Sequence, residues 1–182
     1  MVTSDGVYAI AGGDYRAEVV ATGAGLRMLE RDGRALTESW TAGEKPPLSA
    51  GLILAPWPNR TRDGLYTFDG AEHQLEITEA PRNNASHGLV RRRDWTLVEH
   101  TESSVEQSID IGGETGWPFP LRLTVVHAVS DAGLRVTHTA TNIGESDAPY
   151  LMGVHSFVRA GDAPIDDCTI SVPSSDRGPP MS

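Results

Sequence analysis

The sequence has a single cysteine and no long apolar run, and each shortage excludes a class of protein. Cys168 is alone among 182 residues, so an internal disulfide cannot form. No apolar stretch approaches the roughly 20 residues that a membrane-spanning helix needs. Met1–Val7 shows no basic region followed by an apolar run, as a secretion signal would. We therefore expect a cytoplasmic protein without a membrane span.

Basic residues are also scarce. Lys and Arg number 15 against 25 Asp and Glu, for a formal net charge of −10. Nucleic-acid backbones are bound by concentrated Lys and Arg, so we expect no nucleic-acid partner. The basic run Arg91-Arg92-Arg93 is interpreted as a solvated loop, or as a holder of a sugar phosphate if it faces a binding pocket.

A chain of this length, with 38% hydrophobic and 22% charged residues, is sufficient for one domain with a sizeable core. We place that domain at residues 1–172. The remainder, 173–182, is a polar tail that contains Gly178-Pro179-Pro180. No internal repeat and no second domain is evident.

Helical periodicity is missing, because nowhere do apolar residues recur at helical spacing for ten residues. Alternation with a period of two is clearest in 121–130 and 134–142, which are joined by Asp131-Ala132-Gly133. A second hairpin is predicted around Asp69-Gly70. Further strands are predicted at 7–10, 15–20, 26–29, 52–54, 95–99, 105–111, 149–157 and 168–172. The pattern predicts an all-β domain of antiparallel strands.

Six histidines are candidates for chemistry. His127 and His138 lie on apolar strand faces and are interpreted as hydrogen-bonded core residues. His87 differs because it lies in a polar loop without apolar periodicity, and His155 differs because it interrupts an apolar run at a strand end. For each of these two alone, a functional and a structural role remain equally open.

An arginine joins these two histidines. Pro56 and Pro58 cannot donate hydrogen bonds to a sheet, so the chain must leave the sheet around Trp57 and expose Asn59 and Arg60 at a strand end. A guanidinium stays charged and offers a fork of donors, and histidine exchanges protons near neutral pH. We therefore predict that this arginine and the two histidines form one polar cluster that binds a neutral, hydroxyl-rich ligand.

Other kinds of site find little support. No pair of His, Cys or carboxylate residues has the tight spacing of metal ligands, and Asp166-Asp167-Cys168 alone is not a metal site. The G-x-S-x-G motif of a serine nucleophile is absent. We expect neither a metal nor a cofactor.

An ordered series of short motifs resembles the aldose 1-epimerase (galactose mutarotase) family over almost the whole chain. The matching residues are Asn59-Arg60, Gly64, Tyr66, Phe68, Gly70, His87-Gly88, Trp117-Pro118, Asn142 and His155 within Gly153-Val154-His155. The resemblance implies an antiparallel β-sandwich of the supersandwich type, with sugar bound on the concave face of one sheet.

The resemblance also implies roles for the site residues. By similarity, His155 is the general acid that protonates the ring oxygen of an aldohexose such as galactose or glucose. His87 and Arg60, with its neighbour Asn59, bind the sugar. A carboxylate removes the proton of the anomeric hydroxyl, the ring opens, and closure after rotation gives the other anomer, without a cofactor.

This sequence departs from the family pattern in two places. Ser156 and Phe157 follow the histidine where many members have Pro and Tyr. The family's glutamate base and a substrate-binding aspartate lie further downstream than this chain extends, so we expect a C-terminally incomplete sandwich with the acid but not the base. Exposed sheet edges would then favour self-association. A non-catalytic carbohydrate-binding module and a truncated, inactive product are the alternatives.

Overall fold

The computed structural model describes residues 6–171, which form two four-stranded antiparallel sheets and three two-stranded ones. The predicted tail at 173–182 lies outside the described residues. The first sheet has the order β1-β2-β3-β4 and the second the order β10-β11-β12-β13. Their bounds are β1 Val7–Gly12, β2 Tyr15–Val20, β3 Leu26–Arg31, β4 Arg34–Ala35, β10 Thr96–His100, β11 Ser104–Ile111, β12 Leu121–Ser130 and β13 Gly133–Asn142.

The smaller sheets pair β5 with β14, β6 with β9 and β7 with β8. Their bounds are β5 Ile53–Leu54, β6 Arg60–Arg62, β7 Leu65–Phe68, β8 Ala71–Gln74, β9 Asn84–Ser86 and β14 Gly153–Val154. Helical structure in the described part is confined to three short 3₁₀ turns, namely η1 Pro47–Ser49, η2 Ala80–Arg82 and η3 Ile165–Asp167. None of them is long or apolar enough to cross a membrane.

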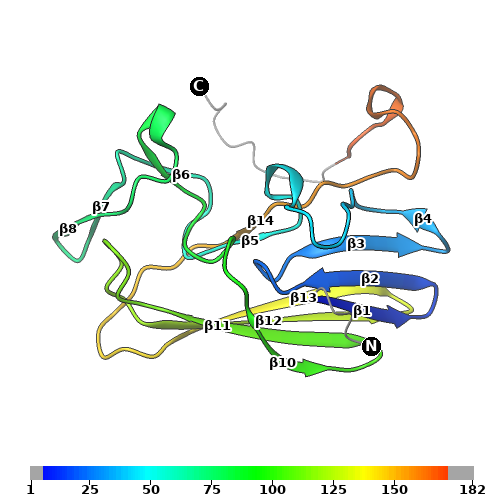
Figure 1. Cartoon of the computed structure of the whole chain (residues 1–182), viewed down its shortest axis with the longest axis horizontal. Coiled ribbons are helices and arrows are strands. Elements are labelled where there is room, and N and C mark those ends of the chain that lie inside the picture. The colour runs from blue at the N-terminus through cyan, green and yellow to red at the C-terminus, as the bar shows by residue number, and fades with distance from the viewer. Residues whose placement is uncertain (1–5, 172–182) are drawn as a thin grey trace.

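The β10–β13 sheet is the base on which the other sheets lie (Figure 1). One end of it packs against β1 and β2 around a first core, whose buried members are Tyr8, Ile10, Ala17, Val19, Val105 and Val129. The other end packs against the region of β5 to β9 around a second core that includes Trp95, Ile109, Trp117, Phe119, Leu123 and Val125. The all-β, antiparallel sandwich expected from the sequence is confirmed.

Alternation explains why β12 and β13 form. Every second residue of β12 from Leu121 to Val129 is buried, and β12 pairs with β13 through a turn in which Ser130 faces Gly133. His127 lies on this buried face and is 2% exposed. Its burial agrees with the expectation, but the expected hydrogen bond is wrong, because within the described residues the His127 ring has no hydrogen-bond partner and its Nδ1 is fully buried. Burial, with the nearby His138, lowers the pKa of His127 to about 4, so this histidine is neutral in the folded protein.

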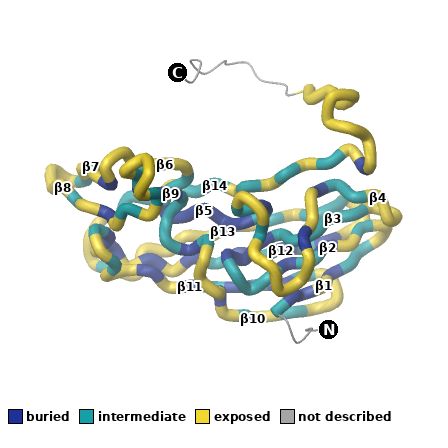
Figure 2. The backbone as a smooth tube through the Cα atoms, turned by 45° about the horizontal axis from the view of Figure 1, so that its top comes forward, coloured by how far each residue is buried: buried dark blue, intermediate teal, exposed yellow. Residues whose placement is uncertain are grey.

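The last predicted strands are shorter than expected or missing. In the predicted strand at 149–157, only β14 pairs, and it pairs with β5. The strand predicted at 168–172 is wrong over 168–171, where the chain is exposed and forms no strand. A strand needs a neighbour to bond with, and local β-propensity does not supply one. After β14, residues 157–161 run beside residues 35–38, and the chain from 162 to 171 is exposed where it leaves the sheets (Figure 2).

Candidate functional site

His155 is positioned by the β5–β14 pair. Its backbone N–H donates to the carbonyl of Leu52 at 3.1 Å, and its own carbonyl accepts from the N–H of Gly51 at 2.8 Å. The imidazole lies edge-on to Phe157, with ring centroids 5.2 Å apart. Among the residues that the structure describes, no hydrogen-bond partner reaches either ring nitrogen of His155. Both nitrogens are therefore available to a ligand.

His87 and Asn59 are held by the β6–β9 pair, in which Arg60 lies opposite Ser86. The His87 N–H donates to the Asn59 carbonyl at 2.8 Å, and the Asn59 N–H donates to His87 Nδ1 at 3.1 Å. Both residues have positive φ, 57° for Asn59 and 62° for His87. Such conformations are costly for residues other than glycine, so the two reciprocal hydrogen bonds stabilise an otherwise unfavourable backbone.

Gly88 lets this loop approach β5 closely. Its φ is +70°, and a Cβ there would lie 2.0 Å from the carbonyl oxygen of Ala55. The following residue, Leu89, donates its N–H to the same oxygen at 2.7 Å. Only glycine fits this contact, and the contact places His87 beside the segment that carries His155.

The two histidines predicted as part of one site are in contact. Their ring centroids lie 5.9 Å apart, and the rings are nearly perpendicular, at 81°. Both side chains are partly exposed. Segments from three distant parts of the sequence, around residues 59, 87 and 155, therefore meet at one place, near β5, β6 and β14 in Figure 1.

The tautomer of His87 follows from its hydrogen bonds. Because Nδ1 accepts the N–H of Asn59, the proton of the neutral ring is on Nε2. Burial, followed by the charges of Arg91, His155 and Arg60, lowers the pKa of His87 below its usual range. At neutral pH this imidazole is thus a hydrogen-bond donor through Nε2 and carries no charge.

Arg60 lies at the start of β6 with its side chain 40% exposed, and it is tied to Glu79. Nε donates to one carboxylate oxygen at 2.5 Å and an Nη donates to the other at 3.1 Å, while the remaining Nη donates to Asn59 Oδ1 at 3.3 Å. A guanidinium has five N–H groups, so two remain for a ligand.

Glu79 is a weak base in this position. It also accepts a hydrogen bond from Arg82 at 3.1 Å. Its hydrogen bond with Arg60 is the main reason that the pKa of this carboxyl falls to about 2. It orients Arg60 and does not supply a proton acceptor for chemistry near pH 7.

Arg91 is the side chain of the basic run that comes to this place. It is half-buried and donates to Ser49 Oγ at 3.1 Å. Arg92 is exposed, and Arg93 pairs instead with Glu114 at 2.9 Å. The sequence showed the basic run but not which of its three arginines lies near His87.

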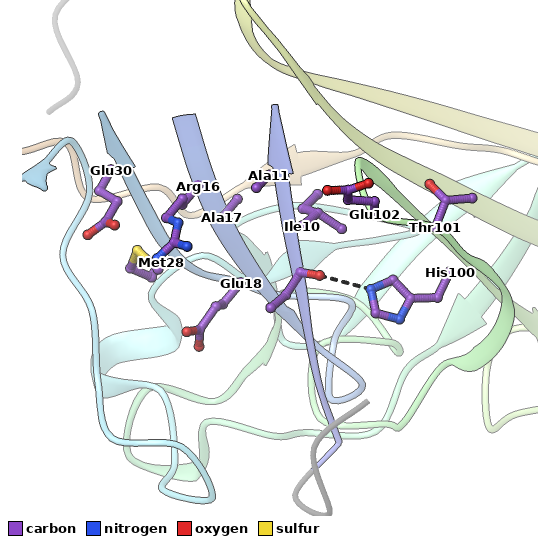
Figure 3. Close-up of a pocket in the computed structure, with 11 residues that line it drawn as sticks. Ile10, Ala11, Arg16, Ala17, Glu18, Met28, Glu30, His100, Thr101 and Glu102 are labelled. Carbon is purple, nitrogen blue, oxygen red and sulfur yellow. Dashed lines mark hydrogen bonds between the residues drawn. The ribbon is translucent and has the colours of Figure 1, made fainter. Parts of the chain in front are cut away.

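A hollow of about 550 Å³ lies elsewhere, on β1 to β3 and the turn after β10 (Figure 3). Its lining includes His100, whose Nε2 is 2.9 Å from the Ala9 carbonyl and whose ring lies edge-on to Tyr8. Of its carboxylates, Glu18 is paired with Arg27. These contacts give His100 and Glu18 structural roles. In the described part of the chain, no group of three or more His, Cys, Asp or Glu side chains is placed to hold a metal ion.

Comparison with known proteins gives one consistent result. The family model for aldose 1-epimerase matches residues 6–179. Protein YihR of Escherichia coli K12, which is uncharacterized, is 36% identical over 167 residues, or 91% of this chain and 54% of YihR. Protein LacX of Lactococcus lactis is 33% identical over 72 residues, which is 38% of this chain and 24% of LacX.

Solved structures agree with the fold. A GalM/aldose epimerase homologue from C. elegans superposes with a TM-score of 0.73 at 25% identity, covering 86% of this chain and 51% of that one. A galactose mutarotase-like protein from Clostridium acetobutylicum gives a TM-score of 0.72 at 22% identity, covering 81% and 49%, a likeness that concerns the fold alone. The chain spans about half the length of YihR and of these two structures.

Proposed function

This chain belongs to the aldose 1-epimerase family, and from that premise we propose that it binds an aldohexose such as galactose or glucose and interconverts its α and β anomers. The observation that carries the proposal is the contact between the rings of His87 and His155, 5.9 Å apart, beside Arg60. Two imidazoles at this spacing offer a proton and a hydrogen bond to neighbouring oxygens of one sugar ring.

Each residue has a role that suits its contacts. His155, with its ring nitrogens unengaged within the described residues, protonates the ring oxygen as general acid. His87 donates from Nε2 to a sugar oxygen, since its Nδ1 is occupied by the N–H of Asn59. Arg60 uses its two remaining N–H groups on hydroxyls. Opening the C1–O5 bond leaves an aldehyde, which rotates about C1–C2 and closes to the other anomer.

The reaction also needs a base to remove the proton of the anomeric hydroxyl. Glu79 does not suit that role, because Arg60 and Arg82 hold it as a carboxylate with a pKa of about 2. This observation favours a second candidate function, sugar binding without turnover, in which the same three side chains serve as ligand contacts. The two candidates differ in whether His155 transfers a proton.

The test compares wild-type protein with His155→Ala and, as a control, His138→Ala on β13. Freshly dissolved α-D-galactose and α-D-glucose are followed by polarimetry, and binding is measured by calorimetry. We expect wild-type protein to accelerate anomer interconversion and His155→Ala to lose about 10²–10⁴-fold of that acceleration. Binding without acceleration supports the second candidate, and the absence of both contradicts the proposal.

Self-association through exposed sheet edges is a further part of the proposal. β13 is the last strand of its sheet, and three exposed apolar residues, Leu151, Val154 and Val158, lie on the segment that contains β14. Open edges and apolar surface favour pairing between chains. Sedimentation velocity over a hundredfold range of protein concentration measures this directly, and a concentration-independent monomer contradicts it.

We also propose that the protein acts in the cytoplasm and that residues 1–172 form one domain.

A further inference from the structure

Arg91 joins the two loops that hold the candidate site. It follows Gly88 by three residues on the His87 side, and its Nη1 donates to Ser49 Oγ at 3.1 Å. Ser49 in turn lies two residues before Gly51, whose N–H donates to the carbonyl of His155 at 2.8 Å. The guanidinium therefore lies between the segment that positions His87 and the segment that positions His155.

The backbone of Arg91 is held in place as well. Its carbonyl lies so close to Gly23 that a Cβ there would be 2.7 Å from the oxygen, and the Gly23 N–H donates to the carbonyl of Arg93 at 2.8 Å. The backbone of Arg91 is thus fixed in position, and partial burial restricts the conformations of its side chain.

Arg91 has no direct ion pair within the described residues, and the carboxylate that acts on it from nearby, Glu79, is already paired with Arg60 and Arg82. Arg60, Arg93 and Arg122 each pair with a carboxylate, whereas no carboxylate of the described residues forms an ion pair with Arg91. Its hydrogen bond to Ser49 uses one of five N–H groups, and the other four have no partner among residues 6–171. Partly burying a cation without a direct ion pair is unfavourable, and a bound anion would offset that cost.

The surroundings point the same way. The chain as a whole is acidic, with a net charge of −10, yet Arg60 and Arg91 both lie near His87, with Glu79 as their acidic neighbour. Glu79 is already bound by Arg60 and Arg82. The charge of Arg91 reaches His87, since it is the second cause, after burial, of that histidine's lowered pKa.

We propose that the sugar bound between His87 and His155 carries an anionic substituent, and that Arg91, oriented by Ser49, binds it. This inference rests on the proposed function and names its substrate class: a hexose with a phosphate, sulfate or carboxylate group. A neutral sugar gains hydrogen bonds from such a guanidinium but does not neutralise its charge, whereas an anionic substituent does both. A guanidinium binds an oxyanion through two parallel hydrogen bonds, which fixes orientation as well as charge.

The experiment measures calorimetric affinities at low ionic strength for four sugars that differ only at C6. D-glucose is neutral, D-glucose 6-phosphate and D-glucose 6-sulfate carry tetrahedral groups of different charge, and D-glucuronate carries a planar one. The proteins are wild type, Arg91→Met, Arg91→Lys and the control Arg92→Met, which removes an exposed charge from the same run. Thermal unfolding of each variant verifies that it is folded.

We expect wild-type protein to bind at least one anionic sugar tenfold or more tightly than glucose. Arg91→Met is expected to reduce that ratio to about one with glucose affinity unchanged within about twofold, Arg91→Lys to retain part of it, and Arg92→Met to leave it intact. Equal affinity for glucose and all three anions, or a ratio that survives in Arg91→Met, overturns the inference while the proposed function stands. If wild-type protein binds none of the four sugars, the inference fails, and if it also neither binds nor interconverts D-galactose, the proposed function fails with it.

Discussion

Replacing Gly88 by alanine tests whether the close approach of two backbones holds the His87 loop in place. A Cβ at this position would lie 2.0 Å from the Ala55 oxygen and 2.3 Å from its carbonyl carbon. Neither atom belongs to a flexible side chain, so the backbone itself must move. Gly70 is a matched control, because its φ of +74° is close to the +70° of Gly88 and nothing lies within 4 Å of its would-be Cβ.

The magnitudes follow from these contacts. Both variants force alanine into a left-handed conformation, which costs about 1–2 kcal/mol. Gly88→Ala adds a steric term of about 1–3 kcal/mol and loses much of the hydrogen bond from Leu89 to Ala55, worth about 1 kcal/mol. The free energy of unfolding should therefore fall by about 2–4 kcal/mol more in Gly88→Ala than in Gly70→Ala.

Urea denaturation followed by tryptophan fluorescence is the assay. With a slope of about 2 kcal/mol per molar, the difference between the two variants corresponds to a midpoint shift of about 1–2 M. Gly88→Ala should also weaken sugar binding, because His87 is its neighbour, whereas Gly70→Ala should not. Equal midpoints for the two variants would refute the claim that this contact, rather than the glycine's conformation alone, sets the loop.

Two further predictions concern the core. Leu123 is 2% exposed, so Leu123→Ala should lower the free energy of unfolding by about 2–5 kcal/mol. Val98 is 55% exposed, so Val98→Ala should lower it by less than about 0.5 kcal/mol, and urea midpoints measure both. The pKa of His127 is lowered to about 4 when folded, so as pH falls from about 6.5 the unfolded chain takes up this proton first and stability declines by about 3 kcal/mol towards pH 4. His127→Leu should flatten that part of the stability profile, and an unchanged profile would show that other groups govern it.

Local sequence patterns predicted the hairpins well, but they could not predict which segments distant in the sequence pair with one another. The strand at 15–20, predicted as a run bounded by glycines, and the strand at 121–130, predicted from alternation, have the expected bounds. Asp69-Gly70 does form the turn between β7 and β8, with φ of 48° and 74°. By contrast, the predicted strand at 168–172 looked β-like but has no partner over its described residues, which a single sequence cannot reveal.

The same limit applies to the candidate site. Sequence reasoning grouped Arg60, His87 and His155, and the structure brings the two imidazoles into contact and places Arg60 on the neighbouring strand. It could not anticipate that Glu79 binds Arg60, because that contact depends on the geometry of the β6–β9 region. Nor could it tell that Arg91 turns towards Ser49 while Arg93 turns away. Residue types followed from motifs, but the partner of each charge followed from the fold.

Because β14 is only two residues long, hydrogen exchange near His155 should be sensitive to ligand binding. His155 is carried on a ladder that is much shorter than β12, so the amide of His155 belongs to a part of the molecule that opens more readily than the β10–β13 sheet. A sugar bound to both imidazoles would stabilise the paired state of β5 and β14, because its binding free energy adds to the free energy needed to separate the two strands. Hydrogen exchange at His155 would then slow as the sugar saturates, while the amides of β12 keep their rates.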